Sequence, residues 1–61
     1  MRSIKDVKKL WRFYHENFDK RYCKIHFINN EIFVTDTRME KINFVIKNNR
    51  VFSPDTEKFY T

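Results

Sequence analysis

The side chains of this chain that could do chemistry are mostly cations and aromatic rings. Thirteen of its 61 residues are Lys or Arg and eight are Asp or Glu, so the formal net charge is +5. Cations neutralise phosphates and aromatic rings stack on bases, and this combination favours nucleic acid as a partner. The alternative is that the charge only keeps an aromatic-rich domain in solution.

One group of cations lies close to the start of the chain. It consists of Lys5, Lys8, Lys9 and Arg12, whose spacing places them on one flank of a helix. Cations in the first turns oppose the helix dipole by about 0.3–1 kcal/mol each, so phosphate contact is one explanation for their presence. The other is a solvated face, on which Arg12 and Glu16, and Glu16 and Lys20, have ordinary i,i+4 spacing.

The sequence offers little for metal binding or catalysis. Cys23-x-x-His26 has a spacing found in zinc sites, with His15 as a further imidazole. Residues three apart on a strand point to opposite faces, so Cys23 and His26 should neither share a metal nor form a nucleophile–base pair. We therefore predict no metal, no cofactor and no enzymatic activity. A small ribonuclease-like enzyme using His26 as an acid or base remains a third alternative.

The element that would carry the first cations is an N-terminal helix. Ser3 is a good N-cap, and Asp6 can serve weakly as the second half of a capping box. The apolar residues then recur at helical spacing, as Ile4, Val7, Leu10, Trp11, Tyr14 and Phe18. This stripe predicts the core face of a helix that ends near Lys20. Phe13 lies opposite the stripe, which predicts an exposed aromatic able to anchor a protein partner.

Two matching segments predict two β-hairpins. Residues 25–33 and 44–52 each consist of apolar residues, an Asn-Asn pair and apolar residues again. A two-residue type I′ turn needs positive φ at both central positions, and Asn tolerates this best after Gly, which the chain lacks. The predicted fold class is α+β, an N-terminal amphipathic helix packed on a four-stranded antiparallel sheet of two consecutive hairpins.

The turns also set which side chains share a face of the sheet. Phe27 should lie opposite Ile32 on the core side. The outer face then carries Tyr22, Lys24, His26, Ile28 and Phe33 from the first hairpin and Val45, Lys47, Arg50 and Phe52 from the second. Aromatics such as Phe33 and Phe52 among cations suit base stacking and phosphate neutralisation. The alternative is that this face buries against a second copy of the chain or under the tail.

The remaining segments connect or terminate these elements. Residues 36–40 should link the hairpins, and Pro54 should end the last strand. The tail from Asp55 carries Phe59 and Tyr60, which would either fold back over the core or lie in an interface.

The length and composition of the chain indicate its number of domains, its compartment and its origin. A chain of 61 residues supports one domain, over residues 1–61, and its thin stability margin leaves a homodimer open. Cys23 is unpaired and no secretory signal is visible, which favours the cytoplasm. The apolar runs fall short of the roughly 20 residues of a membrane span. Residue types with AT-rich codons fill more than half of the chain, which predicts a low-GC genome and, given the size, a phage or mobile-element origin.

The leading functional hypothesis is a small basic nucleic-acid-binding accessory or regulatory protein. Its candidate binding residues are Lys5, Lys8, Lys9, Arg12, Lys24, His26, Phe33, Lys47, Arg50 and Phe52. The alternative is a protein-binding inhibitor or modulator of a host enzyme or nucleic-acid machine. It would contact an acidic host protein surface through Phe13, Phe33 and Phe52.

Overall fold

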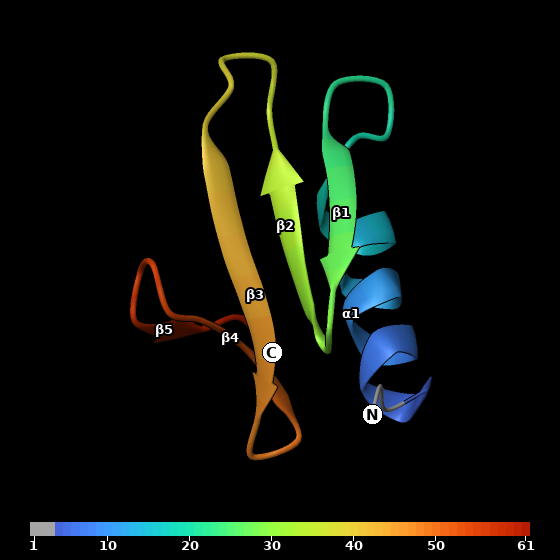
Figure 1. Ribbon diagram of the computed structural model, residues 1–61, viewed down its shortest axis with the longest axis vertical. Helices are drawn as coiled ribbons and strands as arrows, with labels where there is room; N and C mark the ends of the chain where they lie inside the picture. Colours follow the sequence, from blue (N-terminus) through green and yellow to red (C-terminus); the bar gives the residue numbers. More distant parts are fainter. Residues whose placement is uncertain (1–3) are drawn as a thin grey trace.

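The computed structural model describes residues 4–61, which form one helix and one antiparallel sheet (Figure 1). In chain order the elements are α1 (Ile4–Asn17), β1 (Lys24–Ile28), β2 (Glu31–Thr35), β3 (Lys41–Lys47), β4 (Arg50–Ser53) and β5 (Lys58–Phe59). The predicted α+β class with its N-terminal helix is confirmed. The sheet has five strands instead of four, because the tail adds β5. The predicted N-cap, Ser3, lies outside the described residues.

The strands of the sheet follow one another in sequence order, β1-β2-β3-β4-β5. The first part of β3 pairs with β2 and its last residues pair with β4, so β3 joins the two hairpins. Figure 1 shows β1, β2 and β3 side by side, with β4 and β5 beyond β3 and running crosswise to it. Residues 36–40 connect the hairpins, as predicted. Within residues 4–61, no helix has both the length and the apolar character needed to cross a membrane.

Both hairpins have the predicted register. Phe27 lies opposite Ile32 in the first, and Ile46 lies opposite Val51 in the second. A slip of one residue would have moved every side chain of a strand to the other face of the sheet. The core and outer faces are therefore the predicted ones.

The two turns each contain one Asn-Asn pair, but they are of different types. Asn48 and Asn49 have φ values of 52° and 63°, as a type I′ turn requires. In the first hairpin Asn29 has a φ of 56°, whereas Asn30 is not in the positive-φ region. Positive φ at the first central position alone is the pattern of a type II′ turn. The prediction of positive φ at Asn30 was wrong.

The core lies between α1 and the inner face of the sheet. Its buried apolar residues are Leu10, Phe13, Tyr14, Ile32, Val34, Phe44 and Val51. The Tyr14 hydroxyl donates a hydrogen bond of 2.6 Å to the Cys23 carbonyl, at the start of the sheet. This bond ties the helix to the chain entering β1.

The buried face of α1 is rotated from the predicted stripe. Phe13, predicted to be exposed, is only 5% exposed, and its ring centre lies 4.9 Å from that of Phe44. Trp11 and Ile4, predicted for the core, are 45% and 72% exposed. The reason is the tail, since Tyr60 packs beside Phe13 with ring centres 6.0 Å apart and covers that side of the helix.

The helix ends at Asn17 and not near Lys20 as predicted. The Asn17 side chain donates to the Phe13 carbonyl at 2.9 Å, and such side-chain bonds compete with continued helix. Asp19 then accepts a 2.9 Å hydrogen bond from the Arg21 backbone and pairs with its guanidinium at 3.0 Å. These bonds from Arg21 lower the pKa of Asp19.

The tail folds back on the core, which was one of its two predicted placements. Pro54 follows the end of β4, as predicted. The Asp55 carboxylate then accepts a 2.8 Å hydrogen bond from the Asn43 backbone, in place of a strand partner. Beyond β5, the Tyr60 ring packs against Phe44 with centres 5.3 Å apart.

Candidate nucleic-acid interface

The face of the sheet turned away from α1, called here the outer face, carries the cations and rings that the register predicted. His26 lies opposite Phe33, and Val45 lies opposite Phe52. Lys24, His26, Lys47 and Arg50 are exposed, whereas Phe33 and Phe52 are half-buried. The candidate residues of both hairpins therefore share one surface.

Three phenylalanine rings of the outer face each have a cation over them. Lys41 Nζ lies 5.8 Å from the ring centre of Phe33, Lys47 Nζ lies 4.7 Å from that of Phe52, and Arg50 Cζ lies 4.4 Å from that of Phe59. An exposed cation–π contact is worth about 0.5–1 kcal/mol, and a stacked base about 1–3 kcal/mol. A base could therefore displace the cation from the ring, and the displaced cation would remain within reach of a phosphate.

Two residues of this surface were missed by sequence reasoning. Lys41 lies on the same strand as Val45 at an even spacing, so strand alternation would have placed it on the outer face. Phe59 is 38% exposed and its ring centre lies 4.9 Å from that of Phe52. Alternation shows that Phe59 and Tyr60 face opposite ways, but only the pairing of β5 with β4 decides which of them faces outward.

Two adjoining hollows open on the outer face along β1, β2 and β3. The larger, of about 640 Å³, is lined by Arg21, Tyr22, Lys24, His26, Thr35, Asp36, Thr37, Met39 and Lys41. The smaller, of about 310 Å³, is lined by His26, Phe27, Ile28, Phe33 and Lys41. They share His26 and Lys41, so they form one continuous depression. The larger is rich in cations and favours an anionic occupant.

The basic flank of the helix forms its own surface. Its predicted cations together line a hollow of about 210 Å³, and they are Lys5, Lys8, Lys9 and Arg12. Among residues 4–61, Lys5, Lys8 and Arg12 take part in no ion pair. The Arg12–Glu16 pair of the solvated-face alternative is therefore not formed. Its second pair, Glu16 with Lys20, loses its helical spacing because α1 ends at Asn17.

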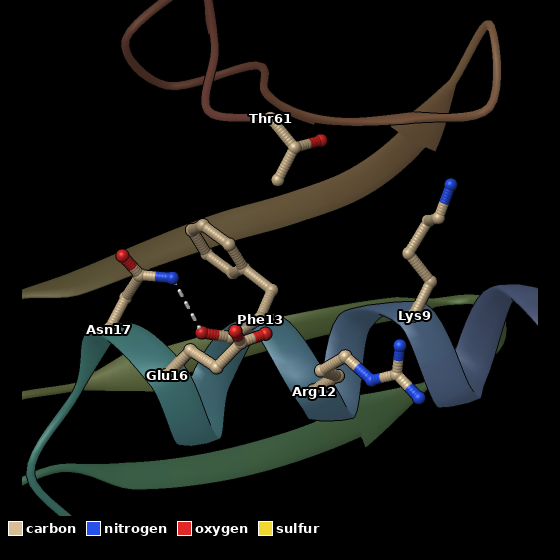
Figure 2. A pocket seen from close by; sticks show the side chains of 6 residues that line it. All are labelled: Lys9, Arg12, Phe13, Glu16, Asn17 and Thr61. Atoms are coloured by element: carbon tan, nitrogen blue, oxygen red, sulfur yellow. Dashed lines mark hydrogen bonds between the residues drawn. The ribbon is translucent and has the colours of Figure 1, made fainter.

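A second hollow connects this flank to the end of the sheet. It has a volume of about 440 Å³ and is lined by Lys9, Arg12, Phe13, Glu16, Asn17 and Thr61 (Figure 2). Figure 2 shows Lys9 extending from α1 toward the strands, and its ammonium donates a hydrogen bond to the carbonyl of Asn49 in the β3–β4 turn. Thr61 faces the hollow from the other side, and its carbonyl accepts a 2.7 Å hydrogen bond from Arg50 Nε.

The candidate metal ligands and catalytic groups lie on different parts of the fold. His15 lies on α1 beside Trp11, with ring centres 4.3 Å apart. Cys23 packs against the core, and His26 is exposed on the outer face, so the two point to opposite sides as predicted. In the part of the chain that the structure describes, no group of three or more His, Cys, Asp or Glu residues could hold a metal ion.

The aromatic that α1 presents to solvent is Trp11 and not Phe13. Because Phe13 is buried in the core, the prediction that it anchors a partner was wrong. Trp11 packs on Phe27 of the edge strand β1, with ring centres 5.9 Å apart, and leaves nearly half of its surface exposed.

Comparison of the whole chain with known proteins assigns no role to these surfaces. No protein-family model, no curated protein and no solved structure matches this chain.

Proposed function

We propose that this protein is a small accessory or regulatory protein that binds nucleic acid on the outer face of its sheet. One observation carries the proposal. Phe33, Phe52 and Phe59, from three different strands, lie on one face, and each is accompanied by a Lys or Arg over its ring. Rings supply stacking surfaces and cations supply phosphate contacts, which are the two components of single-strand binding.

This arrangement predicts affinity with little base specificity. Every base has a π-face, so stacking on Phe33, Phe52 or Phe59 does not select among them. Lys24, His26, Lys47 and Arg50 would contact phosphates, which carry no sequence information. We place the protein in the cytoplasm, as its unpaired Cys23 favours, and its composition supports an origin in a phage or mobile element of a low-GC host.

Phe33, Phe52 and Phe59 are called here the aromatic platform. The test compares the loss of these three rings with the loss of an aromatic ring elsewhere on the surface. The platform variant combines Phe33→Leu, Phe52→Leu and Phe59→Leu, which keeps apolar volume but removes the rings. Binding to a fluorescent single-stranded oligonucleotide at low salt should weaken at least tenfold, since one lost stack of about 1.4 kcal/mol already costs that factor.

The matched control is Trp11→Leu, which removes an exposed ring from α1 and should leave binding within about twofold. Circular dichroism would establish that both variants fold. If the parent protein shows no salt-sensitive binding to DNA or RNA at low ionic strength, the proposed function is wrong.

The second candidate function is that of a protein-binding modulator, and the exposed Trp11 favours it. Tryptophan is enriched among the residues that dominate protein interfaces, and this one lies against the edge strand β1. Under this hypothesis Trp11→Ala would abolish capture of an acidic protein partner, whereas the platform variant would retain it.

A further inference from the structure

We infer that the bound nucleic acid is a flexible single strand that continues from the outer face, around the β3–β4 turn, onto the basic flank of α1. The inference rests on the proposed function and adds a second, phosphate-binding segment to it. The helix flank then serves the same ligand as the sheet and is not a solvated face.

The path leaves the sheet at the turn between β3 and β4. Lys47 and Arg50 pair with each other on either side of this turn. They are also the cations over Phe52 and Phe59, so the last rings of the platform lie beside the turn. A strand stacked on these rings would have its next phosphates at this end of the molecule.

One hydrogen bond and one shared hollow connect this end of the sheet to the helix. Lys9 of α1 donates a hydrogen bond to the carbonyl of Asn49 within the turn. Arg50 donates to the carbonyl of Thr61, and Thr61 lines the same hollow as Lys9 and Arg12 (Figure 2). The cations of the sheet and of the helix therefore border one continuous surface.

The helix flank has the properties of a phosphate site. Lys5, Lys8, Lys9 and Arg12 line one hollow, and among residues 4–61 only Lys9 of these donates a hydrogen bond to another part of the fold. Like charges at i,i+4 spacing, such as Lys5 with Lys9 and Lys8 with Arg12, destabilise a helix by about 0.2–0.5 kcal/mol per pair. A phosphate in the hollow would remove this repulsion.

The size of the molecule decides between a single strand and a duplex. The domain measures 30 × 22 × 19 Å. The helix covers the opposite face of the sheet. A path from the outer face to the helix must therefore turn through a large angle within a molecule only 19 Å across in its shortest dimension. Duplex DNA has a persistence length of about 500 Å and would resist such a bend, whereas a single strand follows it.

The experiment uses two single-stranded oligonucleotides, of about 4 and about 16 nucleotides, which span the site sizes of small single-strand-binding domains. The flank variant combines Lys5→Ala, Lys8→Ala and Arg12→Ala, and leaves Lys9 in place because of its contact with the turn. The control combines Lys20→Ala, Arg38→Ala and Lys58→Ala, which removes the same formal charge from exposed residues that belong neither to the helix flank nor to the cations over the platform rings.

The parent protein should bind the long oligonucleotide more tightly than the short one. The flank variant should lose that difference, with a log–log salt slope for the long oligonucleotide smaller by about 2, as expected for three lost phosphate contacts. Its affinity for the short oligonucleotide should equal that of the control.

Other results would overturn the inference. If the flank variant and the control bind the long oligonucleotide equally, the helix takes no part, while the proposed function stands. Equal weakening toward both oligonucleotides would show a general charge effect and no second segment. If the parent binds neither, the proposed function and the inference both fail.

Discussion

Asparagine forms both tight turns of this glycine-free chain, but the two turns make different demands on it. Asn49 has a φ of 63°, which glycine would adopt with less strain, and Asn30 is outside the positive-φ region. At position 30 a glycine would relieve no strain in the folded protein. It would only increase the conformational freedom of the unfolded chain, which lowers the free energy of unfolding. The same substitution should therefore have opposite effects in the two hairpins.

We expect Asn49→Gly to raise the free energy of unfolding by about 0.3–1 kcal/mol and Asn30→Gly to lower it by about 0.5–1 kcal/mol. Urea denaturation of the two variants beside the parent protein provides the measurement. A gain in stability for Asn30→Gly would show that the first turn is of type I′ after all.

Tyr14 makes the stability of the fold depend on pH in the alkaline range. Burial raises the pKa of its phenol above the ordinary value of 10.0, and Cys23 and Asp19 act in the same direction. Above about pH 10 the unfolded chain loses this proton while the folded protein keeps it. The contribution of Tyr14 is therefore complete below pH 10 and is lost as the pH rises through the folded pKa.

Tyr14→Phe should cost about 0.5–1.5 kcal/mol at pH 7, because the Cys23 carbonyl loses its hydrogen bond. Between pH 9 and 11.5 the variant should lose less stability than the parent protein. The control is Tyr22→Phe, which alters an exposed phenol. Parallel stability curves for the parent and Tyr14→Phe would contradict the role of Tyr14.

At the scale of the element, α1 shows how one helix can be rotated by a segment far away in the sequence. The apolar stripe included Trp11 and left out Phe13, yet Phe13 is buried against Phe44 and Tyr60. The rotation of the helix buries the Phe13 ring on the side that the tail reaches. It leaves Trp11, at the other side of the predicted stripe, exposed to solvent.

Phe13→Ala should therefore cost about 3–5 kcal/mol, whereas Trp11→Ala should cost less than half as much. A domain of this length has roughly 3–9 kcal/mol of stability in total, so the first variant should be largely unfolded at 37 °C. Circular dichroism with urea denaturation would measure both. A larger loss for Trp11→Ala would restore the stripe read from the sequence.

At the scale of the whole molecule, the low stability expected of a small domain means that ligand binding should change its melting temperature by a large amount. A ligand that binds only the folded state stabilises it by about 2.7 kcal/mol at a free concentration of 100 Kd. For a domain of this size that corresponds to a rise in Tm of about 10–20 °C.

We expect a single-stranded oligonucleotide of about 16 nucleotides to raise Tm at low salt and to lose this effect as the salt concentration increases. A duplex of the same length should raise Tm much less, because it cannot follow the path around the domain. Differential scanning fluorimetry across a salt series would measure both. Equal shifts for duplex and single strand would argue against the bent path.

Much of the candidate surface could be predicted from local rules. The Asn-Asn turns set the hairpin registers, and strand alternation then placed His26, Phe33, Lys47 and Phe52 on one face. Lys41 follows from the same rule. The helix flank was also predictable, because helical spacing alone brings its cations together.

What the sequence determined by itself was therefore the helix, both hairpins, their registers and the outer face, since each depends on contacts between residues close together in the chain. Tertiary structure alone decided which side of α1 is buried, that β5 exists, and that Phe59 faces outward while Tyr60 joins the core. These features depend on contacts between the tail and elements far away in sequence. Local preferences for two tail residues are too weak to specify such contacts, and only the packing of the complete core selects them.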